Sequence, residues 1–194
     1  MKEKKNNNPN DEDSDNKAFH MFEHLEQNKK IYSIYLSNEI EDPSKYTDMF
    51  HKLRTIEPEA GVLLYLAGVG GDCDGMLAII NAIHDCSAPV CSVVHGNVRS
   101  AHSSIAVAAD QLIVYPDVVM MFHTYSGGMS GKSHELTSRL ASDILQQKDI
   151  DKKYAIPFLT QAEFNQMLDG KDFWFHANRN DVKSRIARHN KHRK

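Results

Sequence analysis

Residues Val90 to His123 read VCSVVHGNVRSAHSSIAVAADQLIVYPDVVMMFH and carry the clearest structural pattern of the chain. Its first apolar run, over 90–94, predicts a buried strand, and the small residues of 101–110 predict a closely packed helix. Two short apolar runs follow the helix and predict two more strands. This order places Ser100 at a strand-to-helix turn and His123 at the end of the last strand.

The turn puts a hydroxyl group where a helix begins. The first N–H groups of a helix have no partners within it, and the helix dipole favours negative charge there. A nucleophile, a base and N–H donors for an oxyanion are the requirements of acyl transfer. Ser100 is therefore the candidate nucleophile, and His123, returning on a later strand, is the candidate general base.

A serine at a helix start is more often a cap than a nucleophile. Two features favour the nucleophile here: Gly96 allows a tight turn, and His123 follows on the expected strand. Ser103 and Ser104 are the rival hydroxyls, but they lie one turn further into the helix, where no sharp turn would present them.

These residues resemble the proteolytic subunit of the Clp protease family (ClpP). The family's Gly-x-x-x-Ser, small-residue helix and apolar pair before His are matched by Gly96–Ser100 and Met121–His123. Upstream, an apolar strand ending at Gly70–Gly71 resembles the family's oxyanion loop. The resemblance covers roughly residues 31 to 177.

The resemblance implies a triad of Ser100, His123 and Asp172. His123 would accept the Ser100 proton, and Asp172 would orient and stabilise the imidazolium. Asp169 is the rival acid; Asp172 is preferred because the apolar residues 173–175 follow it, where the chain re-enters the core.

The resemblance also assigns backbone roles to glycines. The N–H groups of Gly71 and Ala101 would form the oxyanion hole. Gly127 and Gly128 would lie alongside an extended peptide substrate, with ordinary turn chemistry as the alternative.

Alternating strand and helix patterns imply an α/β fold with a mainly parallel sheet. The resemblance implies the ClpP/crotonase-like fold of repeated ββα units, with a helical handle projecting over about 133–172. Residues 1–17 are expected to be a disordered polar tail, 18–186 the peptidase domain and 187–194 a basic tail. The amphipathic segment after residue 18 would serve the axial pore and the ATPase partner, or be a helix docked on its own domain or a neighbour.

The composition excludes several function classes. The chain has 194 residues, is 41% hydrophobic and carries a net charge of −3, which argues against nucleic-acid binding. No apolar run reaches membrane-spanning length, so a cytoplasmic protein is expected. Three cysteines without a CxxC pattern predict reduced thiols, and eleven histidines without metal-ligand spacing predict neither metal nor cofactor.

The resulting expectation is an ATP-dependent serine endopeptidase that cleaves peptides or unfolded proteins inside a homo-oligomeric chamber. The resemblance implies two stacked heptameric rings, a tetradecamer, fed by an AAA+ unfoldase. The alternatives are a phage-type protease for capsid maturation, an inactive structural or regulatory ring subunit, and crotonase-like acyl-CoA chemistry. The last would require a Glu near the oxyanion loop, where only Asp72 and Asp74 occur.

Two departures from the family pattern carry expectations of their own. Gly68–Val69 stand where the family usually has Ser-Pro, which predicts a looser oxyanion loop. Arg99 and His102 flank Ser100 where the family favours small apolar residues, which predicts an altered peptide preference or a contact with a neighbouring chain.

Overall fold

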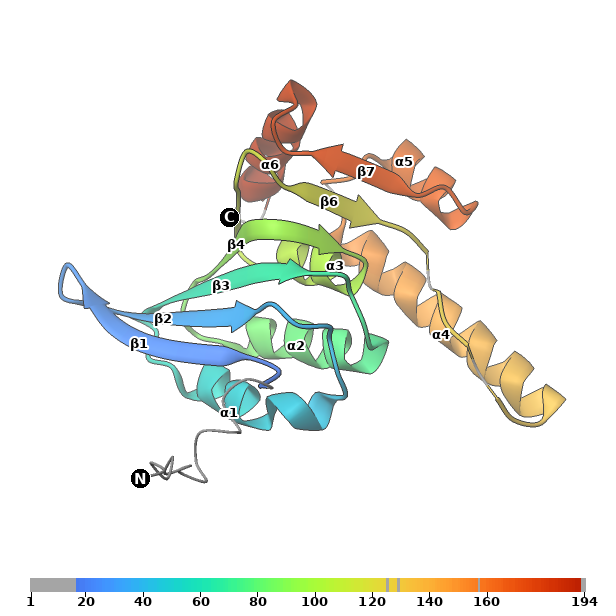
Figure 1. Cartoon of the computed structure of the whole chain (residues 1–194), viewed down its shortest axis with the longest axis horizontal. Helices are drawn as coiled ribbons and strands as arrows, with labels where there is room; N and C mark the ends of the chain where they lie inside the picture. Colours follow the sequence, from blue (N-terminus) through green and yellow to red (C-terminus); the bar gives the residue numbers. More distant parts are fainter. Residues whose placement is uncertain (1–16, 125, 129, 157, 193–194) are drawn as a thin grey trace, which may run out of the picture.

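A seven-stranded sheet forms the centre of the chain in the computed structural model (Figure 1). The structure describes residues 17–124, 126–128, 130–156 and 158–192. The strands run in the order β1-β2-β3-β4-β6-β7, and β5 pairs with β4 off this path. Their bounds are β1 (His20–Glu26), β2 (Lys29–Leu36), β3 (Gly61–Gly68), β4 (Val90–Arg99), β5 (Gln111–Val114), β6 (Val119–Phe122) and β7 (Phe173–His176).

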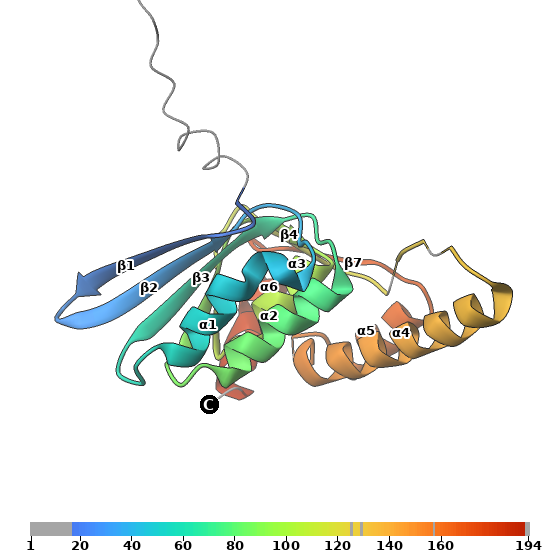
Figure 2. The same cartoon turned by 90° about the horizontal axis from the view of Figure 1, so that it is seen from below.

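Helices connect the strands, so the expected α/β fold is confirmed. The pairs β2–β3, β3–β4, β4–β5 and β4–β6 are parallel, whereas β1 and β7 add antiparallel edges. Figure 2 shows α1 and α2 lying together on one side of strands β1–β3. The helices are η1 (Pro43–Tyr46), α1 (Thr47–Thr55), α2 (Cys73–Asp85), α3 (Ala101–Ala108), α4 (Ser133–Tyr154), α5 (Gln161–Leu168) and α6 (Asn180–His192).

Strand β4 changes partner along its length. Residues 91–94 pair with β5, and the last two residues, Val98 and Arg99, pair with Met120 and Met121 of β6. The carboxyl ends of β4 and β6 therefore lie side by side. This arrangement brings the residue that follows β4 close to the residue that follows β6.

Gly96 lies inside β4 and does not form the turn expected there. A Cβ at this position would lie 2.7 Å from Ala67 Cβ. The glycine thus allows close approach of β3, next to a register shift between Leu66 and Gly68. The turn itself is formed four residues later, at Ser100.

The amphipathic segment after residue 18 is a strand and not the helix considered from sequence. β1 pairs antiparallel with β2 through Gln27 and Asn28, whose φ values of 49° and 65° suit a tight hairpin turn. Most of β1 is exposed, including Phe22 and Leu25. The predicted disordered tail lies almost entirely outside the described residues.

The segment 187–192, expected to belong to a solvated basic tail, continues helix α6. His189 is fully buried, and the Asn190 side chain bonds both the N–H and the carbonyl of Leu112. These residues of α6 therefore pack over β5, although their polar and basic composition predicted a solvated tail.

Helix α4 projects away from the sheet in both views (Figures 1 and 2). Its buried residues are confined to its carboxyl-terminal end, at Ile150, Asp151 and Tyr154. α5 follows it and begins with the predicted capping box of Thr160 and Glu163. Pro157, expected to interrupt the helical region, lies outside the described residues.

Candidate active site

Ser100 forms the turn between β4 and α3. Its backbone has φ 53° and ψ −125°, a conformation that few residues other than glycine adopt. The Ser100 N–H donates to the Met121 carbonyl at 3.0 Å, which anchors the turn to β6. Ser100 is the N-cap residue of α3, yet its hydroxyl makes no capping hydrogen bond. The hydroxyl therefore lacks the structural role that serines at helix starts usually have.

The loop Gly70–Gly71 lies directly beside Ser100. A Cβ at Gly70 would lie 2.7 Å from Ser100 Cβ, and the φ of Gly70 is 112°, so glycine alone suits this position. Ile40 holds the loop from its other side: its N–H donates to the Gly70 carbonyl at 2.8 Å, and its carbonyl accepts from the Asp72 N–H at 2.7 Å.

Two backbone N–H groups remain available near the Ser100 hydroxyl. Within the described parts of the chain, neither the Gly71 nor the Ala101 N–H donates to another protein group. Ala101 is the first residue of α3, so its N–H has no acceptor within the helix. Gly71, Ala101 and Ser100 line one pocket, as the oxyanion assignment requires.

His102 holds the Gly70–Gly71 loop in place. Its side chain is fully buried, and its Nδ1 accepts a hydrogen bond from the Gly70 N–H at 3.1 Å. Burial lowers the pKa of His102 to about 4, so the ring is neutral and can accept this bond near neutral pH. A Cβ at Gly68 would overlap the imidazole ring, so Gly68 provides the space for it.

These contacts correct the expectation of a loose loop and the part of the second expectation that concerns His102. The loop is fixed by Ile40 and His102 instead of being loose, and His102 faces the protein interior instead of substrate or a neighbouring chain. The Arg99 guanidinium lies over the Trp174 ring at 5.7 Å from its centroid, on β7. Neither of the residues flanking Ser100 lines its pocket.

His123 directly follows β6 and is half-buried. It lines the same pocket as Ser100, a space of about 30 Å³ that we call the catalytic pocket. The structure therefore brings together four of the predicted site residues, namely Ser100, His123, Gly71 and Ala101.

Asp172 lies at the edge of this arrangement. The antiparallel register pairs Phe122 with Phe173, so His123 and Asp172 occupy the next opposed positions of β6 and β7. Asp172 is exposed, and no hydrogen bond or ion pair between it and His123 occurs among the described residues. The rival Asp169 is the C-cap of α5, where its N–H bonds the Asn165 carbonyl. The strand register thus favours Asp172 over Asp169.

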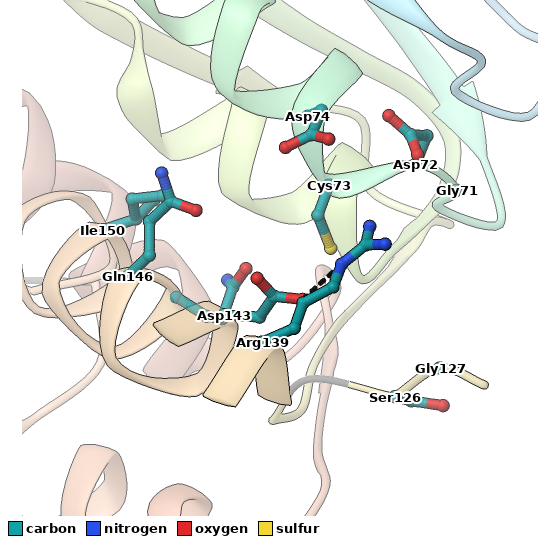
Figure 3. Close-up of a pocket in the computed structure, with 11 residues that line it drawn as sticks. Gly71, Asp72, Cys73, Asp74, Ser126, Gly127, Arg139, Asp143, Gln146 and Ile150 are labelled. Atoms are coloured by element: carbon teal, nitrogen blue, oxygen red, sulfur yellow. Dashed lines mark ion pairs between the residues drawn. The ribbon is translucent and has the colours of Figure 1, made fainter. Parts of the chain in front are cut away.

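Gly127 lines a second hollow of about 220 Å³, which lies between the start of α2 and α4 (Figure 3). We call it the acidic groove because Asp72, Asp74 and Asp143 line it, with Arg139 as the one cation among its lining residues. Gly128 lies next in the chain, and a Cβ at this position would have no described atom within 4 Å. Ser126–Gly128 form no strand, so the expected peptide-binding strand is not formed in this structure.

The two rival serines have structural partners. Ser103 Oγ donates to the Val98 carbonyl at 3.2 Å, and Ser104 Oγ donates to Asp151 Oδ1 at 3.4 Å. Asp151 lines the catalytic pocket and was missed from sequence. It is one of several charged residues on α4, and no local pattern distinguishes it from the exposed ones.

Two findings on the described residues concern other site types. None of the helices is long and apolar enough to cross a bilayer. No group of three His, Cys, Asp or Glu side chains within these residues is arranged to hold a metal ion.

A family model described as Clp protease matches residues 13–180, which is most of the chain. The match includes the sheet up to β7, the Gly70–Gly71 loop, the Ser100 turn, His123, the projecting helix α4 and Asp172. The mixed α/β sheet with its helices is consistent with the ClpP fold. The chain belongs to the Clp protease family.

Proposed function

We propose that this chain is a serine endopeptidase that cleaves extended peptides with Ser100 as nucleophile and His123 as general base. The observation that carries the proposal is the Ser100 turn: a strained backbone presents a hydroxyl without a capping partner in the pocket that His123 lines. Membership of the Clp protease family supports the same reaction class.

The proposed reaction follows from these positions. His123 takes the proton of Ser100 Oγ as this oxygen attacks the carbonyl carbon of the scissile bond. The N–H groups of Gly71 and Ala101 donate to the developing oxyanion, and one such donor typically contributes about 3 kcal/mol. His123 then gives the proton to the leaving amine as the C–N bond breaks. A water molecule, deprotonated by His123, hydrolyses the acyl ester and restores Ser100.

Asp172 would accept a hydrogen bond from the far nitrogen of His123. The opposed positions of these residues on β6 and β7 support this role, although they are not bonded in the isolated chain. Catalytic hydrogen bonds are often long in the absence of substrate and shorten in the complex.

The finer proposals concern assembly. We propose a homo-oligomeric chamber of two stacked rings, supported by Leu140, Ile144 and Leu145, which are 42%, 50% and 60% exposed on α4. An AAA+ unfoldase would deliver unfolded proteins to it. An inactive ring subunit is the alternative, favoured by the missing bond between His123 and Asp172.

Labelling with a fluorophosphonate probe tests the proposal. The wild type should be labelled and Ser100→Ala should not, because the probe forms a bond to an activated serine oxygen. Ser103→Ala is the matched control: its hydroxyl donates to Val98, outside the reaction, so labelling should persist. An unlabelled wild type that is folded would favour the inactive subunit.

A further inference from the structure

Asp151 is a buried carboxylate in the pocket of the nucleophile. It is only 4% exposed, and it lines the catalytic pocket together with Ser100 and His123. Its hydrogen-bond donors are neutral: the Ser104 hydroxyl at 3.4 Å and the Gln147 side chain. A buried carboxylate is ordinarily paired with a cation, because the loss of hydration is costly.

No Lys, Arg or His of the described chain forms an ion pair with Asp151. Lys148, Lys152 and Lys153 are its nearest candidates in sequence on α4, but all three are exposed to solvent. Burial accordingly raises the pKa of Asp151 to about 6, which still leaves it mostly ionised at neutral pH. The negative charge thus lacks a counter-charge within the described chain.

The space around Asp151 suits a long side chain. The catalytic pocket alone, at about 30 Å³, holds roughly one water molecule. Asp151 also lines an outer hollow of about 180 Å³, formed with Thr124, Ile144, Leu168 and the solvent-exposed Lys148. Thr124, Gln147 and Asp151 line both spaces, so a side chain that passes the catalytic pocket reaches the larger one beside the carboxylate.

The position of Asp151 relative to Ser100 sets the length of that side chain. Ser104, which bonds Asp151, lies four residues after Ser100, or about 6 Å along the axis of α3. The four-carbon stem of a lysine, or an arginine, can span such a distance from a carbonyl held at Ser100.

We infer that Asp151 is the specificity residue of this peptidase and selects Lys or Arg immediately before the scissile bond. The cationic head of the substrate supplies the counter-charge that the chain lacks. The neighbouring acidic groove adds a field that attracts basic peptides, since three carboxylates and one guanidinium line it. This inference rests on the proposed function and adds its substrate class.

The test measures kcat/KM for fluorogenic peptides that differ only in the residue before the cleaved bond: Lys, Arg, norleucine or Glu. The wild type should prefer Lys and Arg over norleucine by about tenfold or more, and should reject Glu. Asp151→Asn should lose this preference, so that the ratio of kcat/KM for Lys over norleucine falls towards one, and fluorophosphonate labelling of Ser100 shows that the variant folds. Asp149→Asn removes the same charge from an exposed position of α4 and should keep the preference.

The outcomes separate the two proposals. A wild type that is labelled by fluorophosphonate at Ser100 but prefers norleucine overturns the specificity inference alone. A preference for Lys that persists in Asp151→Asn also overturns that inference and leaves the proposed function standing. A folded wild type that is neither labelled nor active on any of the peptides overturns the proposed function, and the specificity inference with it.

Discussion

The Nδ1 atom of His102 accepts a hydrogen bond from the Gly70 N–H at 3.1 Å, which links the helix starting at Ser100 to the loop carrying Gly71. Both proposed oxyanion donors are therefore positioned by α3: Ala101 directly, as its first residue, and Gly71 through His102. The bond also leaves the Gly71 N–H, and not that of Gly70, available to substrate.

Gly68 and His102 should behave as a complementary pair. Gly68→Ala would push a methyl group into the imidazole ring, so we expect a loss of about 1–3 kcal/mol in the free energy of unfolding. His102→Ala removes the ring and the bond to Gly70, and should cost about 2–4 kcal/mol. The double variant should lose less free energy of unfolding than the two single losses added together, because the added methyl group then fills part of the space that the ring has left.

Urea denaturation of the four proteins at one protomer concentration would measure this coupling. Peptide hydrolysis should fall in His102→Ala more than its stability loss explains, since the oxyanion loop has lost its anchor. Strict additivity of the two losses would mean that the ring and Gly68 are not in contact.

Asp151→Asn should stabilise the protein at neutral pH. The folded state holds a proton on Asp151 more tightly than the unfolded chain does, with a pKa of about 6 against an ordinary 3.8. Stability is therefore lost as the pH rises from about 4 to 6, by up to about 3 kcal/mol. The neutral amide avoids this loss, so the melting temperature of the variant should exceed that of the wild type at pH 7.5 and match it near pH 4.

His102 should oppose this effect in the wild type. Its pKa is lowered from 6.5 to about 4, so the unfolded chain binds more protons between these values and stability rises with pH there. Asp151 and His102 therefore change the stability in opposite directions as the pH rises, over nearly the same pH range. Asp151→Asn should therefore show a steeper rise of stability from pH 4 to 6.5 than the wild type. A variant whose pH profile parallels that of the wild type would show that Asp151 is not buried as a charge.

Asp172→Asn should lower kcat on short peptides by on the order of 10³–10⁴, the usual effect of removing a triad acid. The amide cannot stabilise the imidazolium of His123, although it has nearly the same shape. Asp169→Asn is the matched control three residues earlier, at the end of α5, and should leave kcat unchanged. The reverse pattern of activities would move the acid of the triad to Asp169.

The order of strands and helices could be predicted because apolar runs and glycines mark them locally. The placement of Ser100 and His123 at strand ends could be predicted for the same reason, since each follows directly on a strand whose pattern is clear. β1 was missed because its apolar residues also fit a short helix, and its turn at Gln27 and Asn28 contains no glycine.

Asp151 and His102 could not be predicted in their roles because both depend on tertiary contacts. Asp151 resembles every other acid on α4 until the helix docks against α3 through Ser104. His102 was interpreted as a group flanking the nucleophile, whereas the space left by Gly68 draws its ring into the interior. Residues far apart in sequence create both environments, so the periodicity of a single helix or strand does not predict them.

The exposed apolar residues of α4 should hold the oligomer together. Leu140 and Ile144 lie one turn apart and are 42% and 50% exposed, on a helix that projects from the sheet. A pair of glutamates at these positions would place charge on the surface that a second copy would cover. We expect light scattering to give a wild-type mass many times that of the 22.0 kDa chain, and a much lower mass for Leu140→Glu/Ile144→Glu.

Ser142→Glu is the matched control: it adds charge on another face of the same helix and should leave the mass unchanged. Circular dichroism should show equal helix content in all three proteins, because none of these side chains belongs to the buried core. A wild type that scatters as a single chain at micromolar concentration would contradict the chamber and leave the handle without a partner.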